Sequence, residues 1–265
     1  MSRWRTSLAV TPPWTGAQTD DLRRREGQII LLSDALTPAQ RSDATLDVST
    51  ALQTADDYAG SVGAIIEFQP REYLLAAKVT KSPYSTWRGH PNSKYGVTAN
   101  DATGTSGSRI AAGYNGTLVE LAAQGAQIYA GYTGIEGVSF FNNPATYAAA
   151  TAISIGTNNR QMVLADMLIK GFLYGIYGSP SELYCDRIFT DHNKYSCYLF
   201  AAADSWLFRC HFGSGSQTAY PANGIGLTLI NCNNIEGYAL RLQVQRSGPG
   251  AQIQSCKTVH LQGGY

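Results

Sequence analysis

The sequence is poor in charged residues and contains no long apolar run. Only 15% of its 265 residues are Asp, Glu, Lys or Arg, and the formal net charge is +1. A balance so close to zero gives no electrostatic reason to expect binding to nucleic acid or insertion at an anionic membrane. No apolar stretch approaches the ~18 residues of a membrane-spanning helix. The N-terminus also lacks the apolar core of a secretory signal peptide, so we expect a chain that is made in the cytoplasm without export.

Closely spaced cysteines are absent as well. Five cysteines are present, but none stands in a Cys-x-x-Cys pair, and no dense cluster of carboxylates suggests a calcium site. We therefore expect no metal and no cofactor. A disulfide framework is typical of an even number of cysteines in a short secreted chain, which does not describe this one. The favoured interpretation is reduced cysteines that pack as small apolar groups in a core.

Four of the cysteines recur at a near-regular spacing. Cys185, Cys210, Cys232 and Cys256 are separated by 25, 22 and 24 residues, and Ala165 extends the column toward the N-terminus. Such a period is typical of a solenoid, in which one coil cannot bury its apolar face until the next coil stacks on it. The spacing predicts that these small residues form one interior ladder.

The type of solenoid follows from the local pattern. The apolar runs are short and rich in β-formers, such as 206–208 and 227–230, and turn residues such as Gly213-Ser214-Gly215 interrupt them. Helical repeats would show longer runs with a period of three or four, and leucine-rich repeats would show a denser leucine pattern. We therefore predict an all-β fold, a right-handed parallel β-helix with strands stacked at about 4.8 Å.

Three regions are expected along the chain. Residues 1–42 show no repeat and are interpreted as an adaptor or attachment segment. A helix over about 48–58 is predicted by apolar residues three or four apart, and it would cover the first coil. The β-helix then occupies the rest of 43–265. Residues 261–265 read like the middle of a coil. We therefore expect the β-helix to continue beyond Tyr265, or its open end to be covered there by partner chains.

The order of these parts resembles the opening of the pectate-lyase-like β-helices. A capping helix is followed by a strand, by Pro70 and Tyr73 in a turn motif, by a second strand and by Arg88-Gly89. The family has a glycine where this chain has Glu72. The resemblance covers about residues 45–265 and implies the fold, whereas the scaffold itself carries lyases, hydrolases and binding modules.

Within that superfamily the chain resembles bacteriophage tailspikes and tail fibres, because it has no export signal and has a separate segment ahead of the helix. This resemblance implies a homotrimer in the virion, attached to other phage tail or baseplate proteins through residues 1–42. It also implies contact with bacterial surface polysaccharide, which many spikes depolymerise. The alternatives are a stand-alone polysaccharide lyase or glycoside hydrolase, and a purely structural virion adaptor.

Candidate catalytic residues follow the ladder position. There the column reads Asp166, Asp186 and His211, with Asn233 later in the same column. Two carboxylates on adjacent coils would lie at a separation suited to glycoside hydrolysis, where one carboxyl holds a proton and the other does not. The alternatives are that these are ordinary solvated side chains, with Asp186 paired to an arginine, or that they bind substrate without catalysing a reaction. Four further carboxylates are possible substitutes: Glu182, Asp191, Asp204 and Glu236.

Candidate sugar-binding residues are aromatic or polar. Aromatic rings stack on the apolar C–H faces of sugars, and polar side chains satisfy the hydroxyl groups. Tyr174 and Tyr177 are flanked by glycines and are expected at the surface, with Arg187 and Asn233 as hydroxyl partners. Trp206 lies inside an apolar run and is expected in the interior.

Overall fold

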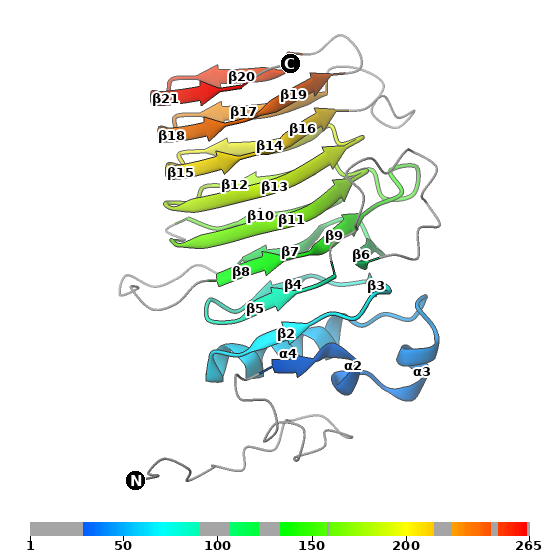
Figure 1. The fold of residues 1–265 in the computed structure, drawn as a ribbon. Helices are drawn as coiled ribbons and strands as arrows, with labels where there is room; N and C mark the ends of the chain where they lie inside the picture. Colours follow the sequence, from blue (N-terminus) through cyan, green and yellow to red (C-terminus); the bar gives the residue numbers. More distant parts are fainter. Residues whose placement is uncertain are drawn as a thin grey trace, which may run out of the picture.

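The computed structural model describes residues 29–90, 107–121, 133–157, 160–214, 224–244 and 249–263. Successive coils stack into an elongated column, with the helices at one end and the last coil at the other (Figure 1). Every strand pairing described is parallel, and each coil pairs with the coil before it. The predicted fold, a right-handed parallel β-helix, is confirmed.

Two sheets form the walls of the column. The 14-stranded sheet contains β1 (Ile29–Leu31), β2 (Ile65–Glu67), β3 (Glu72–Leu75), β5 (Thr86–Arg88), β6 (Ser108–Ala112), β8 (Thr133–Glu136), β9 (Val138–Phe141), β11 (Met162–Lys170), β13 (Leu183–Asp191), β15 (Ala203–Phe208), β16 (His211–Ser214), β18 (Asn233–Tyr238), β19 (Arg241–Val244) and β21 (Lys257–Gln262). The 7-stranded sheet contains β4 (Val79–Lys81), β7 (Thr117–Leu121), β10 (Thr151–Ile155), β12 (Tyr174–Gly178), β14 (Tyr195–Phe200), β17 (Ile225–Ile230) and β20 (Ala251–Gln254).

Three helices lie at the N-terminal end: α2 (Leu32–Ala35), α3 (Pro38–Ser42) and α4 (Ser49–Val62). Helix α4 is the predicted capping helix. It buries Leu52, Ala55 and Ala59, as the spacing predicted, and it ends at Gly63, whose φ of 68° is the left-handed conformation that glycine adopts without strain. Within the described part of the chain, no helix has the length and apolar character needed to cross a bilayer.

The predicted boundary at residue 42 lies too far along the chain. Strand β1 already pairs in parallel with β2, with Ile30 opposite Ile66, and Leu32 and Leu36 are buried in the same core. These apolar side chains extend the first coil toward the N-terminus, so residues 29–42 belong to the β-helix. Residues 1–28 lie outside the described residues, and the attachment role predicted for the segment stays a prediction.

The cysteines are interior, but they do not form the single ladder that we predicted. Cys185 lies opposite Leu164 and Leu207, whereas Cys210 follows β15 and lies near the start of β16. Only Cys232 and Cys256 stack, each directly before the register pair Asn233 and Lys257. The reason is that coil length varies: the step between residues equivalent to Leu164 is 21, 22, 30 and 24 residues.

The thiols nevertheless behave as the sequence predicted. All five cysteines are free, and four of them are buried. Burial raises the pKa of the Cys210 thiol to about 12 and that of Cys232 to about 11. Protonated thiols are small and weakly polar, so they pack in the core as apolar groups.

Candidate functional site

The candidate site lies on the outer face of the 14-stranded sheet, where the long strands bend. Asp166, Arg187 and Arg209 have φ angles of 54°, 53° and 49°, and they mark one corner on three successive coils. Before this corner the strands are extended, so alternate side chains point outward. Two outward rows result. One row contains Val163, Tyr184, Trp206 and Glu236, and the other contains Ala165, Asp186, Phe208 and Tyr238.

Aromatic rings dominate these rows. The ring centroids of Tyr184 and Phe208 are 5.4 Å apart with an interplanar angle of 30°, and those of Phe208 and Tyr238 are 5.4 Å apart at 26°. Trp206 lies beside Tyr184 on the next strand. We call Tyr184, Trp206, Phe208 and Tyr238 the aromatic strip. It runs over three successive coils, along the axis of the helix.

Trp206 corrects a prediction from the sequence. It is partly exposed on the outer face, because its neighbours Ser205 and Leu207 take the two inward positions. The run Trp206-Leu207-Phe208 is apolar on both faces of the strand, and such a run does not show which face is buried. The tyrosine next to it, Tyr184, is 38% exposed.

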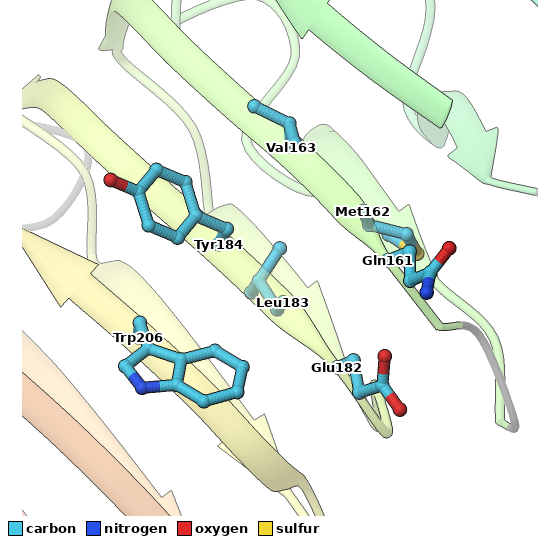
Figure 2. Close-up of a pocket in the computed structure, with 7 residues that line it drawn as sticks. All are labelled: Gln161, Met162, Val163, Glu182, Leu183, Tyr184 and Trp206. Atoms are coloured by element: carbon cyan, nitrogen blue, oxygen red, sulfur yellow. The ribbon is translucent and has the colours of Figure 1, made fainter. Parts of the chain in front are cut away.

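A groove with a volume of about 380 Å³ lies at one end of the aromatic strip. Its lining is mostly apolar and consists of Gln161, Met162, Val163, Glu182, Leu183, Tyr184 and Trp206. Figure 2 shows Gln161 and Glu182 close to the starts of β11 and β13, with the rings of Tyr184 and Trp206 farther along the strands. The groove is open beside Tyr184 because the next residues in that row are the smaller Val163 and Gly134.

A polar row borders the groove and the strip. Gln161 and Glu182 directly precede the register pair Met162 and Leu183, and on the following coils Asp204 lies opposite Asn234. The Asn234 amide donates to the Asp204 carboxylate over 2.7 Å. Side chains with amide or carboxylate groups thus form a row over four successive coils, three of which also carry the aromatic strip.

Asp166 and Asp186 lie on adjacent coils, but they are not equivalent residues. Asp186 pairs with Ala165, and Asp166 is one residue further along, at the corner. Arg187 lies between them and donates to Asp166 and, over 2.6 Å, to Asp186. Arg209 also donates to Asp186, over 2.9 Å. The predicted column is therefore wrong in register, and the two carboxylates belong to a continuous chain of ion pairs.

His211 does not join the two aspartates. It lies on β16, opposite Phe189 on one side and Arg241 on the other. The centroids of the His211 and Phe189 rings are 4.5 Å apart, and the ring planes cross at 81°. Burial lowers the pKa of His211, and the positive charge of Arg241 lowers it further. Since β16 lies beyond the corner, the predicted triplet of Asp166, Asp186 and His211 is divided between two faces.

The predicted sugar-binding residues also separate. Arg187 is engaged in the ion-pair chain, and the exposed Asn233 lies opposite Ala203 and Lys257. Tyr174 and Tyr177 are partly exposed on the other sheet. There Tyr174 stacks on Tyr195 at 5.0 Å. The full cluster on this sheet is Tyr174, Tyr177, Tyr195, Tyr198 and Phe200. Burial raises the pKa of Tyr174 and Tyr198, and the neighbouring tyrosines add to the effect.

The other carboxylates named from the sequence differ in their surroundings. Asp191 contacts His192 at 2.5 Å and Lys170 at 3.9 Å. Glu236 accepts a hydrogen bond from Tyr238 at 3.3 Å. Glu182 lines the groove, and Asp204 begins the next coil. Among the described residues, no three His, Cys, Asp or Glu side chains gather in a way that would hold a metal ion.

Neither a protein-family model nor a curated protein matches this sequence. Among solved structures, the chain is similar to PfbA, a surface adhesin of Streptococcus pneumoniae. The identity is 14%, the match covers 89% of this chain and 72% of PfbA, and the TM-score is 0.49. It is also similar to the A-module of the mannuronan C-5 epimerase AlgE4 of Azotobacter vinelandii, with 10% identity, coverage of 88% and 95%, and a TM-score of 0.22. Likenesses at this level carry no argument about function.

Proposed function

We propose that the aromatic strip and its groove bind a polysaccharide that lies along the axis of the β-helix. The observation that carries this proposal is the stack of rings at 5.4 Å on successive coils beside an open groove. Strands in the sheet repeat at about 4.8 Å, so each coil offers similar contacts to successive units of a polymer. Rings cover the apolar faces of sugars, and the polar row of amides and carboxylates satisfies their hydroxyl groups.

The proposal predicts a loss of affinity on removal of the tryptophan. Central aromatic anchors of an interface typically contribute about 2 kcal/mol or more, so Trp206→Ala should weaken binding about thirtyfold. Tyr84→Ala serves as the matched control, because Tyr84 is 42% exposed and lies outside the strip and groove. Both variants would be titrated by calorimetry against bacterial capsular polysaccharides and lipopolysaccharides that the parent chain binds.

The tyrosine cluster on the other sheet provides the competing location. If Trp206→Ala binds like the parent chain and Tyr174→Ala does not, the proposed site is wrong and the second sheet carries the sugar.

The same incubations, assayed for released reducing ends, test whether the protein cleaves the polysaccharide. A chain with both Asp166→Asn and Asp186→Asn that still cleaves would contradict the assignment of those carboxylates.

The finer proposal is that the protein is a phage tailspike or tail fibre in the virion, attached through residues 1–42. The separate segment ahead of the capping helix supports it, since spikes of this resemblance attach to the virion through such a segment. A stand-alone lyase or hydrolase and a structural virion adaptor are the rival functions. An enzyme would cleave without residues 1–28, a deletion that keeps β1 and the buried Leu32 and Leu36, and an adaptor would bind no sugar.

This finer proposal predicts a homotrimer. Light scattering on the intact chain should give three times the chain mass of 28.5 kDa, at protein concentrations from micromolar upward. The trimer should persist in Trp206→Ala, because we place that residue in the sugar site. A monomer across the whole concentration range would contradict the spike proposal and favour the stand-alone enzyme.

A further inference from the structure

Negative charge gathers around Trp206. Glu182 lines the groove beside it, Asp204 lies two residues before it on the same strand, and Glu236 lies opposite it in register on the next coil. Asn234 donates to Asp204 and Tyr238 donates to Glu236, and both donors are neutral. Two sides of the indole and the mouth of the groove thus carry carboxylates.

In the described part of the chain no lysine or arginine forms an ion pair with these three carboxylates, and the residue opposite Glu236 on the next coil is His260. Arg160 lies one residue before Gln161, and Lys257 lies opposite Asn233, yet no ion pair links either of them to Glu182, Asp204 or Glu236. The contrast with the corner is clear, because Asp166 and Asp186 share Arg187 there and Arg209 adds a second partner. The charge at the corner is compensated by arginine, whereas the described residues show no lysine or arginine paired with the carboxylates beside Trp206.

An aromatic face next to carboxylates favours a cation. The π-face of Trp is the best partner for an ammonium group in cation–π contacts, and a carboxylate accepts its hydrogen bonds. A mostly apolar groove of about 380 Å³ has room for a sugar ring beside the indole. An anionic sugar, such as a uronate, would meet three like charges at the same place.

We infer that the groove selects a cationic amino sugar, with its ammonium group at Glu182 and its ring on Trp206. This inference rests on the proposed function, since it names the chemical class of the sugar in the same groove. Beyond ring stacking, the affinity of the groove should depend on the charge of one sugar unit of the polysaccharide.

The test compares two oligosaccharides of the same backbone, one with free, protonated amines and one whose amines are acetylated and neutral. Oligomers of glucosamine and of N-acetylglucosamine of equal length would be titrated into the full chain by calorimetry. We expect the glucosamine oligomer to bind at least about tenfold more tightly, as one charge-assisted hydrogen bond provides. Glu182→Gln keeps the size of the side chain and should remove this preference, while Asp57→Asn, an exposed carboxylate on α4, should keep it.

The outcomes separate the two ideas. Equal affinity for both oligomers, lost together in Trp206→Ala, would overturn the amino-sugar inference and leave the proposed function intact. No binding of either oligomer or of the bacterial polysaccharides would overturn both.

Discussion

Replacing Asp56 by alanine is expected to lower the free energy of unfolding by about 3–5 kcal/mol, the usual cost of breaking a buried charged network from one side. Asp56 lies on α4, is fully buried and accepts hydrogen bonds from Ser82 N, Ser85 Oγ and Trp87 Nε1, the last at 2.6 Å. Lys81, also fully buried, donates to Ser85 Oγ over 3.0 Å. Burial lowers the pKa of Lys81 to about 8, opposed by the charge of Asp56. This cluster links the capping helix to the first coils.

Two variants show whether the carboxylate itself is responsible. Asp57→Ala changes the neighbouring, exposed carboxylate and should stay within about 0.5 kcal/mol of the parent. Lys81→Met removes the cation but leaves Asp56 with its three donors, so it should cost less than Asp56→Ala. Urea unfolding gives the free energies, and hydrogen exchange along α4 locates the loss. Equal midpoints for Asp56→Ala and Asp57→Ala would show that the network does not hold the cap.

The class of fold could be predicted from the sequence because it depends on local composition. Short β-rich runs, frequent turns and an amphipathic helix indicate a β-helix whatever the register. The register between successive coils could not be predicted, because it depends on how many residues each corner contains. The register step from Leu207 to Gly237 is 30 residues, against 22 before it and 24 after it, and one such step shifts every later residue. Cys210 and Cys232 therefore kept a regular spacing in sequence without sharing a position.

The same dependence on register explains why some candidate site residues are predicted wrongly from the sequence. The sequence correctly predicts Asp166 and Asp186 on adjacent coils, but its register is wrong by one residue, so Asp166 lies at the bend within β11 and not opposite Asp186. Trp206 was assigned to the interior because its strand is apolar on both faces. In a sequence, a strand with aromatic residues on its outer face has the same apolar pattern as a buried strand. Only the burial of Leu207 in the structure shows that Trp206 points outward.

Replacing Asn193 by alanine is expected to cost about 2–6 kcal/mol, because two buried backbone groups would each lose a partner at about 1–3 kcal/mol. Asn193 is fully buried at the corner between β13 and β14. Its Oδ1 accepts from Phe172 N at 2.8 Å and its Nδ2 donates to Ile169 O at 3.0 Å, both on the preceding coil. Corners leave the hydrogen-bond ladder of the sheet, so a side chain must take over there. Thermal unfolding followed by circular dichroism measures the effect.

The charge-changing variant separates hydrogen bonding from packing. Asn193→Asp keeps the volume and the acceptor for Phe172 N, but it loses the donor to Ile169 O and places a carboxylate against that carbonyl oxygen. If the amide acts through its two hydrogen bonds, Asn193→Asp should be destabilised at neutral pH about as strongly as Asn193→Ala. Asn143 is exposed and serves only a local N–H of Ala145, so Asn143→Ala should remain close to the parent chain. A stable Asn193→Asp would mean that the side chain only fills space, and the coils would then be held at this corner by packing alone.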